Sequence, residues 1–100
     1  MKVRVYFCRE SIGAELVNAR LSRQALETIY DLVWEQELKN VITIGKIWLR
    51  FRQSGRPFGH PLKEKRPHAK IAAGDIIEAA GKCYMVMDVG VKGIELERGG

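Results

Sequence analysis

Apolar and polar residues alternate at the start of the chain, with the period of two that a β-strand with one buried face requires. The apolar members are Val3, Val5 and Phe7. We therefore expect a strand over residues 2–7. Residues 9–20 lose this period and are interrupted by Gly13, so a loop or a weakly ordered second strand around Ala14–Val17 is expected there.

A pattern with helical spacing comes next. Ser22 is a candidate N-cap, because its hydroxyl can accept a hydrogen bond from an unpaired amide of the first turn. The apolar residues after it fall at i, i+3, i+4 and i+7 and so share one helical face. They are Leu26, Ile29, Tyr30, Val33 and Trp34. The spacing predicts a helix from Ser22 to Leu38, with its acidic residues pointing outward.

A second, shorter helix is predicted from Thr43, a possible cap, to Gln53. Its apolar stripe consists of Ile44, Ile47, Trp48 and Phe51, at the same helical spacing. Its other side carries Lys46, Arg50 and Arg52. A strand over Val41–Ile44 is the alternative, since β-branched residues favour strands and Gly45 weakens a helix by about 1 kcal/mol.

The remaining pattern predicts a loop and then a β-meander. Residues 53–70 contain three Pro and two Gly, which prevents a long regular element. This segment is either an ordered loop lying over the domain or a mobile basic arm. Three strands are then expected over residues 75–79, 82–88 and 91–97, with turns at Ala80-Gly81 and Val89-Gly90 and a bulge at Gly93.

These elements predict one α+β domain over residues 1–100. Two helices cover one face of a small antiparallel sheet, which is formed by the N-terminal strand and the C-terminal three-stranded meander. A chain of this length buries enough surface to fold without metal or disulfide staples. We expect Cys8 and Cys83 to be reduced apolar fillers on strands. A monomer or a homodimer is compatible with the pattern.

Positive charge is concentrated in one quarter of the chain. Residues 46–70 contain eight basic residues and one acid, Glu64, so this segment has a formal charge of +7. The rest of the chain has a charge of −2, which gives the whole chain its net charge of +5. The candidate partner-binding residues are these eight bases and the aromatic residue that we expect to be the most exposed: Lys46, Arg50, Arg52, Arg56, Phe58, Lys63, Lys65, Arg66 and Lys70. Such a cluster favours an anionic partner.

No reaction centre emerges from the sequence, so we expect no catalytic residue, no metal and no cofactor. His60 and His68 are eight residues apart, which matches no compact zinc pattern; His60 is expected in a turn and His68 in solvent. A catalytic cysteine would need a general base within reach of its sulfur. Asp75, at the entrance to a strand, is expected to fix a turn by accepting hydrogen bonds from backbone amides.

No apolar run is long enough to span a bilayer, and the N-terminal residues alternate where a signal peptide has an unbroken apolar stretch. A cytoplasmic protein without membrane contact is expected.

Five short motifs, in order, resemble the YodL-like domain. They are Ile29–Glu35, Ile47–Phe51, His60-Pro61, Gly74–Ile77, and Tyr84 with Val89-Gly90. In that family an acidic-aromatic helix precedes a short aromatic helix, a DHP loop, a Gly-Asp turn into a strand and a terminal hairpin. The chain departs from it in lacking serines before the Gly-Asp turn and in the basic insert at residues 63–66.

The resemblance implies a small cytoplasmic protein of bacteria, phages or conjugative elements, with no established enzymatic chemistry. Our leading hypothesis is therefore a non-enzymatic module that docks an acidic protein surface through residues 46–70 and regulates or inhibits its partner. The alternative is a nucleic-acid-binding protein, in which the same bases neutralise phosphates and Phe58 stacks on a base.

Overall fold

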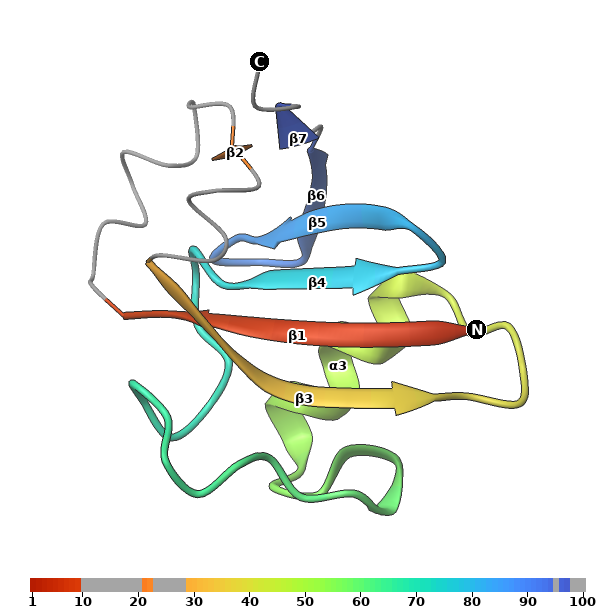
Figure 1. Ribbon diagram of the computed structural model, residues 1–100. Coiled ribbons are helices and arrows are strands. Elements are labelled where there is room, and N and C mark those ends of the chain that lie inside the picture. The colour runs from red at the N-terminus through yellow and green to blue at the C-terminus, as the bar shows by residue number, and fades with distance from the viewer. Residues whose placement is uncertain (10–20, 23–28, 95, 98–100) are drawn as a thin grey trace.

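Five strands form an antiparallel sheet in the order β3-β1-β4-β5-β6 (Figure 1). The structure is a computed structural model and describes residues 1–9, 21–22, 29–94 and 96–97. The five strands are β1 (Lys2–Cys8), β3 (Tyr30–Glu37), β4 (Ile76–Ala79), β5 (Lys82–Val86) and β6 (Val91–Ile94). A short parallel pair joins β2 (Leu21–Ser22) to β7 (Leu96–Glu97).

The first strand and the meander confirm the predicted sheet. β1 is the second strand of the sheet, with the edge strand β3 on one side and the middle strand β4 on the other. The β4–β5 connection is a tight turn in which Ala80 and Gly81 have φ of 52° and 80°. The predicted bulge at Gly93 is wrong, because Gly93 pairs with Tyr84 in an unbroken register.

The helix predicted from Ser22 to Leu38 is wrong over its described part. Ser22 belongs to β2, residues 30–37 form β3, and residues 23–28 lie outside the described part, as does the proposed strand at 14–17. The cause is a bulge: Val5 pairs with Trp34 and Tyr6 with Leu32, so that Val33 is an extra residue.

This bulge gives β3 a buried pattern that imitates a helix. Val33 and Trp34 both contact the core on the same side of the sheet, whereas Tyr30 contacts a cluster on the other side. The buried positions are therefore i, i+3 and i+4, the spacing of a helical stripe. The pattern of apolar residues alone therefore could not distinguish a helix from this bulged strand.

The second predicted helix is confirmed as α3, Ile44–Gln53, with Thr43 at the N-cap position but without a side-chain capping bond. Ile47 and Phe51 are buried against the sheet, and α3 lies behind the sheet in Figure 1. It is the one α-helix among the described residues, so a single helix covers this face where two were predicted. A 3-10 turn, η1 (Pro57–Gly59), follows it.

Hydrophobic side chains form a cluster on each face of the sheet. The first cluster joins α3 to residues of β1, β3, β4 and β5, with Val3, Val5, Phe7 and Ile77 fully buried. The second contains Cys8, Tyr30, Ile76, Cys83 and Met85, and its two cysteines are buried thiols that form no disulfide.

Charged residues share that second face. Arg4 in β1 pairs with Glu35 in β3 and with Glu78 in β4, the latter at 3.1 Å between Nη1 and Oε1. The two carboxylates raise the pKa of Arg4. This cross-strand row joins three strands by opposite charges, as facing residues in antiparallel sheets do. No helix in the described part of the chain is long and apolar enough to cross a membrane.

Candidate functional site

The Pro- and Gly-rich segment after α3 is fixed against β3. The backbone amide of Lys63 donates to the carbonyl of Val33 at 2.9 Å. The indole N–H of Trp34 donates to the carbonyl of His60 at 3.0 Å, and Leu62 is buried in the first cluster. Of the two structures expected for this segment, it therefore adopts the ordered loop.

The far end of the loop is held by His68 and Asp75. His68 Nε2 lies 2.7 Å from Asp75 Oδ2, and the imidazole ring stacks on Phe7 with centroids 4.4 Å apart. The expectation that His68 is solvated is wrong. Asp75 also accepts from the backbone amides of Cys8 at 2.9 Å and Ala72 at 2.7 Å, which confirms its predicted turn-fixing role.

Burial controls the electrostatics of this group. The Asp75 side chain is 1% exposed, and removal from water raises the pKa of its carboxyl, while hydrogen bonds from Cys8, His68 and Ala72 oppose the rise. The Tyr30 hydroxyl beside it donates to the carbonyl of Gly74 at 2.7 Å. The pKa of Tyr30 is raised by burial first and then by the charges of Cys8 and Asp75.

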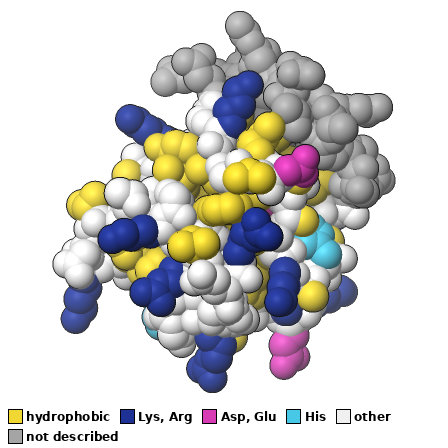
Figure 2. Space-filling view, turned by 180° about the vertical axis from the view of Figure 1, so that it is seen from behind, with side chains coloured by type: hydrophobic (Ala, Val, Ile, Leu, Met, Phe, Trp, Pro, Cys, Tyr) yellow, Lys and Arg dark blue, Asp and Glu magenta, His cyan; other side chains and the backbone are white. Residues whose placement is uncertain are grey.

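Most of the candidate basic side chains lie on the surface of α3 and of the loop. Seven are exposed and have no ion-pair partner among the described residues: Lys46, Arg50, Arg52, Arg56, Lys63, Lys65 and Lys70. Figure 2 shows the helix-bearing face, where Lys and Arg are spread over the surface with hydrophobic side chains between them.

Two of the nine candidates have mainly structural contacts. Arg66 is partly buried, and its guanidinium donates to the carbonyls of Lys63 at 2.7 Å and Ala69 at 3.1 Å. Phe58 is only partly exposed; it packs against the first cluster, with its ring centroid 6.1 Å from that of Trp34. Phe58, expected to be the better exposed aromatic, is therefore half-buried, as Trp48 is, while Phe51 is buried.

Two arginines on α3 lie over aromatic rings. The guanidinium carbon of Arg52 is 5.1 Å from the centre of the Trp48 ring, and that of Arg50 is 5.9 Å from the centre of the Phe58 ring. Stacking restrains a guanidinium while leaving its N–H edges available. These cations are thus positioned in advance for an anionic group.

Three of the residues considered for catalysis or metal binding meet in one place. Cys8, His68 and Asp75 line a hollow of about 360 Å³, in which His68 gives its Nε2 to Asp75 and stacks on Phe7. Even so, no group of three or more such side chains is arranged to hold a metal ion among the residues that the structure describes. The carboxylate of Asp75 holds a turn and a loop.

The chain matches no protein family, no curated protein and no solved structure. The resemblance to the YodL-like domain therefore stays a prediction. Within its motifs, the segment Tyr30–Glu37 is a strand in this structure, while the short aromatic helix and the Gly-Asp turn occur where the resemblance placed them.

Sequence reasoning missed the contacts that hold the loop. The Trp34–His60 and His68–Asp75 contacts join residues whose spacing carries no periodic signal. One signal was present, because Trp34 and His68 have polar ring nitrogens that need partners when they are buried. That signal shows a need for a partner and does not identify it.

Proposed function

We propose that this protein is a non-enzymatic binding module of the bacterial or phage cytoplasm, which docks an acidic protein surface and thereby regulates or inhibits its partner. The observation that supports this proposal is the basic loop and helix face: its backbone is fixed to the sheet, and its exposed cations lack ion-pair partners among the described residues. A fixed surface loses little conformational entropy when it binds.

The surroundings of these cations favour a protein over a nucleic acid. Base stacking needs an open aromatic face, but Phe58 is packed beside Trp34 and faces Arg50. An exposed apolar side chain lies among the bases: Leu49, next to Arg50 on α3, is 44% exposed. Mixed apolar and arginine-rich composition is typical of protein interfaces.

The test compares two charge reversals of equal size. In the first variant Arg56, Lys63 and Lys65 are changed to Glu; in the control Lys39, Lys82 and Lys92 are changed to Glu. All six side chains are exposed, so both variants should fold, because solvated surface charges contribute little to stability. Each variant is used as bait in nuclease-treated bacterial lysate, and the affinity of the captured protein is then measured with purified components.

We expect the first variant to bind at least about 100-fold more weakly than wild type, mainly through a slower association rate, and the control to change affinity less than about fivefold. The association rate of wild type should fall as salt rises. An equal loss of affinity in both variants would show that only the net charge of the protein matters, and would reject the proposed binding surface. If binding disappears after nuclease treatment and returns when DNA or RNA is added, the partner is a nucleic acid and not an acidic protein.

A further inference from the structure

A small hollow opens beside the last turn of α3, within the proposed binding face. Its volume is about 150 Å³, and its walls come from α3, from residues 71–73 and from the end of β5 with the two residues after it. Its lining side chains include Trp48, Arg52, Ile71, Ala73, Met87 and Asp88. This size admits one short side chain and excludes a nucleotide.

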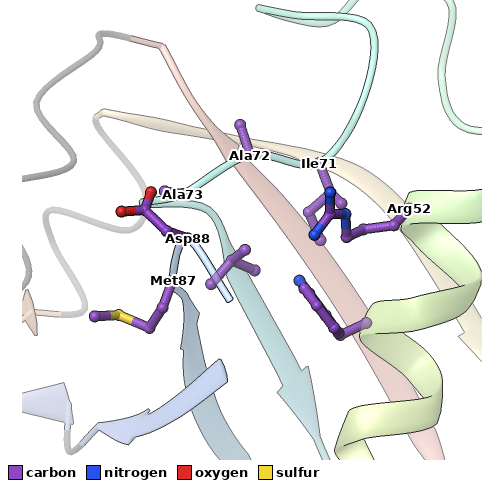
Figure 3. Close-up of a pocket in the computed structure, with 8 residues that line it drawn as sticks. Arg52, Ile71, Ala72, Ala73, Met87 and Asp88 are labelled. Atoms are coloured by element: carbon purple, nitrogen blue, oxygen red, sulfur yellow. The ribbon is translucent and has the colours of Figure 1, made fainter. Parts of the chain in front are cut away.

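Arg52 supplies the one cationic group in the lining. Its side chain reaches over the hollow from α3 (Figure 3), and its guanidinium lies over the Trp48 ring at 5.1 Å. The stacked face is occupied, whereas the N–H edge that forms paired hydrogen bonds with a carboxylate has no acceptor among the described residues. This edge suits an anion with two oxygens.

The acid in the lining does not neutralise this cation. Asp88 lies on the opposite wall and turns its carboxylate away from Arg52 in Figure 3, and no ion pair joins the two residues. Its negative charge on the rim disfavours a phosphate dianion more than a carboxylate, since repulsion grows with the charge of the ligand.

The carbon-rich side chains give the ligand its second property. Ile71 and Val86 are 9% and 2% exposed, and together with Trp48 and Ala73 they offer contact to methylene groups. A carboxylate on a short aliphatic stem therefore suits the hollow, because its charged group can meet Arg52 and its methylene groups can contact the apolar side chains. In a protein, a glutamate side chain has this structure.

We propose that this hollow binds one carboxylate side chain of the partner, with the carboxylate on the Arg52 guanidinium and its methylene stem against Trp48 and Ile71. The inference rests on the proposed function, because it names the anchor by which an acidic protein surface would dock. An anchor of this kind, a stacked arginine in a pocket, is where interfaces concentrate their binding energy.

The experiment uses pentanoate as the probe and follows the Trp48 indole N–H and the Arg52 Nε–H by NMR titration. We expect a Kd on the order of 10 mM, as suits so small a ligand. Pentanamide, which has the same shape without charge, should bind about tenfold more weakly. Inorganic phosphate should not compete at equal concentration.

Three variants separate the site from general charge effects. Arg52→Gln should weaken pentanoate binding about tenfold and leave pentanamide unchanged, whereas Arg56→Gln, an exposed arginine outside the hollow, should leave both unchanged. Ala73→Leu fills the hollow from an exposed position and should abolish both. Equal binding of pentanoate and pentanamide, equal effects of Arg52→Gln and Arg56→Gln, or stronger binding of phosphate would each overturn the proposal.

The same variants distinguish this inference from the proposed function. If pentanoate binds but no acidic protein is captured by the wild type, the site stands and the proposed function fails. If a protein is captured whose affinity is unchanged by Arg52→Gln and Ala73→Leu, the proposed function stands and the anchor is rejected.

Discussion

At the scale of single residues, Asp75 connects distant parts of the chain. Its carboxylate accepts from Cys8 at the end of β1, from Ala72 in its own turn and from His68 in the basic loop. Three hydrogen bonds to a buried carboxylate fix the position of the loop relative to the sheet. The geometry of the binding face therefore depends on a residue that does not lie on it.

Replacing Asp75 with Asn should lower the free energy of unfolding by about 2–3 kcal/mol, because the amide group can accept only on its oxygen and places N–H donors against another donor. Urea denaturation at neutral pH measures this change. His68→Gln is the comparison: it removes one of the three hydrogen bonds and should cost less. A loss below that of His68→Gln would show that Asp75 does not organise this region.

The raised pKa of Asp75 gives this residue a pH dependence with a definite sign. The folded state binds the proton more tightly than the unfolded state, so stability from this group is present at low pH. It is lost as pH rises from the ordinary carboxyl value, about 4, through the folded pKa. Wild type should therefore lose stability relative to Asp75→Asn over this range. The opposite slope would mean that the hydrogen bonds outweigh burial.

At the scale of elements, the β4–β5 turn contains a removable strain. Ala80 has φ of 52°, a left-handed conformation that costs an L-residue with a Cβ about 1 kcal/mol and that Asn tolerates better. Asn-Gly is the preferred pair for such two-residue hairpin turns. The turn was predicted from Gly81, but the strain at Ala80 was visible only in the backbone.

Ala80→Asn should raise the free energy of unfolding by about 0.5–1 kcal/mol, measured by thermal or urea denaturation. Ala69→Asn is the matched control, because Ala69 is exposed and its φ is negative, and it should bring no gain. An equal gain in stability in both variants would show that the polarity of Asn causes the gain, and that backbone strain at Ala80 does not.

The comparison of β3 with α3 shows why one element was predicted and the other was not. In α3 the stripe from Ile44 to Phe51 is a local property of a helix. Lys46 and Arg50 are exposed beside it, and Arg52 flanks the stripe over Trp48. In β3 the bulge at Val33 depends on register with β1. Pairing between strands separated by more than twenty residues cannot be inferred from the period of one segment.

At the scale of the whole molecule, β1 is an interior strand that pairs with β3 on one side and with β4 on the other, so the sheet depends on the C-terminal meander. β4 pairs with β1 over Val3–Tyr6, and β4 and β5 supply Ile77 and Val86 to the core beneath α3. Without these strands, β1 presents an open edge and the apolar side of α3 loses much of its cover.

A chain ending at Asp75 should therefore fail to fold and should aggregate. Its amide NMR spectrum should lack dispersion, or the chain should remain insoluble, and no cooperative unfolding transition should be observed. The full chain under the same conditions is the reference. A dispersed spectrum with a cooperative transition from residues 1–75 would show that β1, β3 and α3 fold as an independent unit.

The sequence by itself determined β1, α3, the meander and the concentration of positive charge, because each of these is expressed over a few neighbouring residues. The period of side-chain direction, the turn residues and the charge count are local properties. Tertiary structure decided the remainder: the bulged strand β3, the loop fixed by Trp34 and His68, and the hollow under Arg52. Each of these depends on contacts between residues far apart in the chain, which register and packing select and which no local pattern encodes.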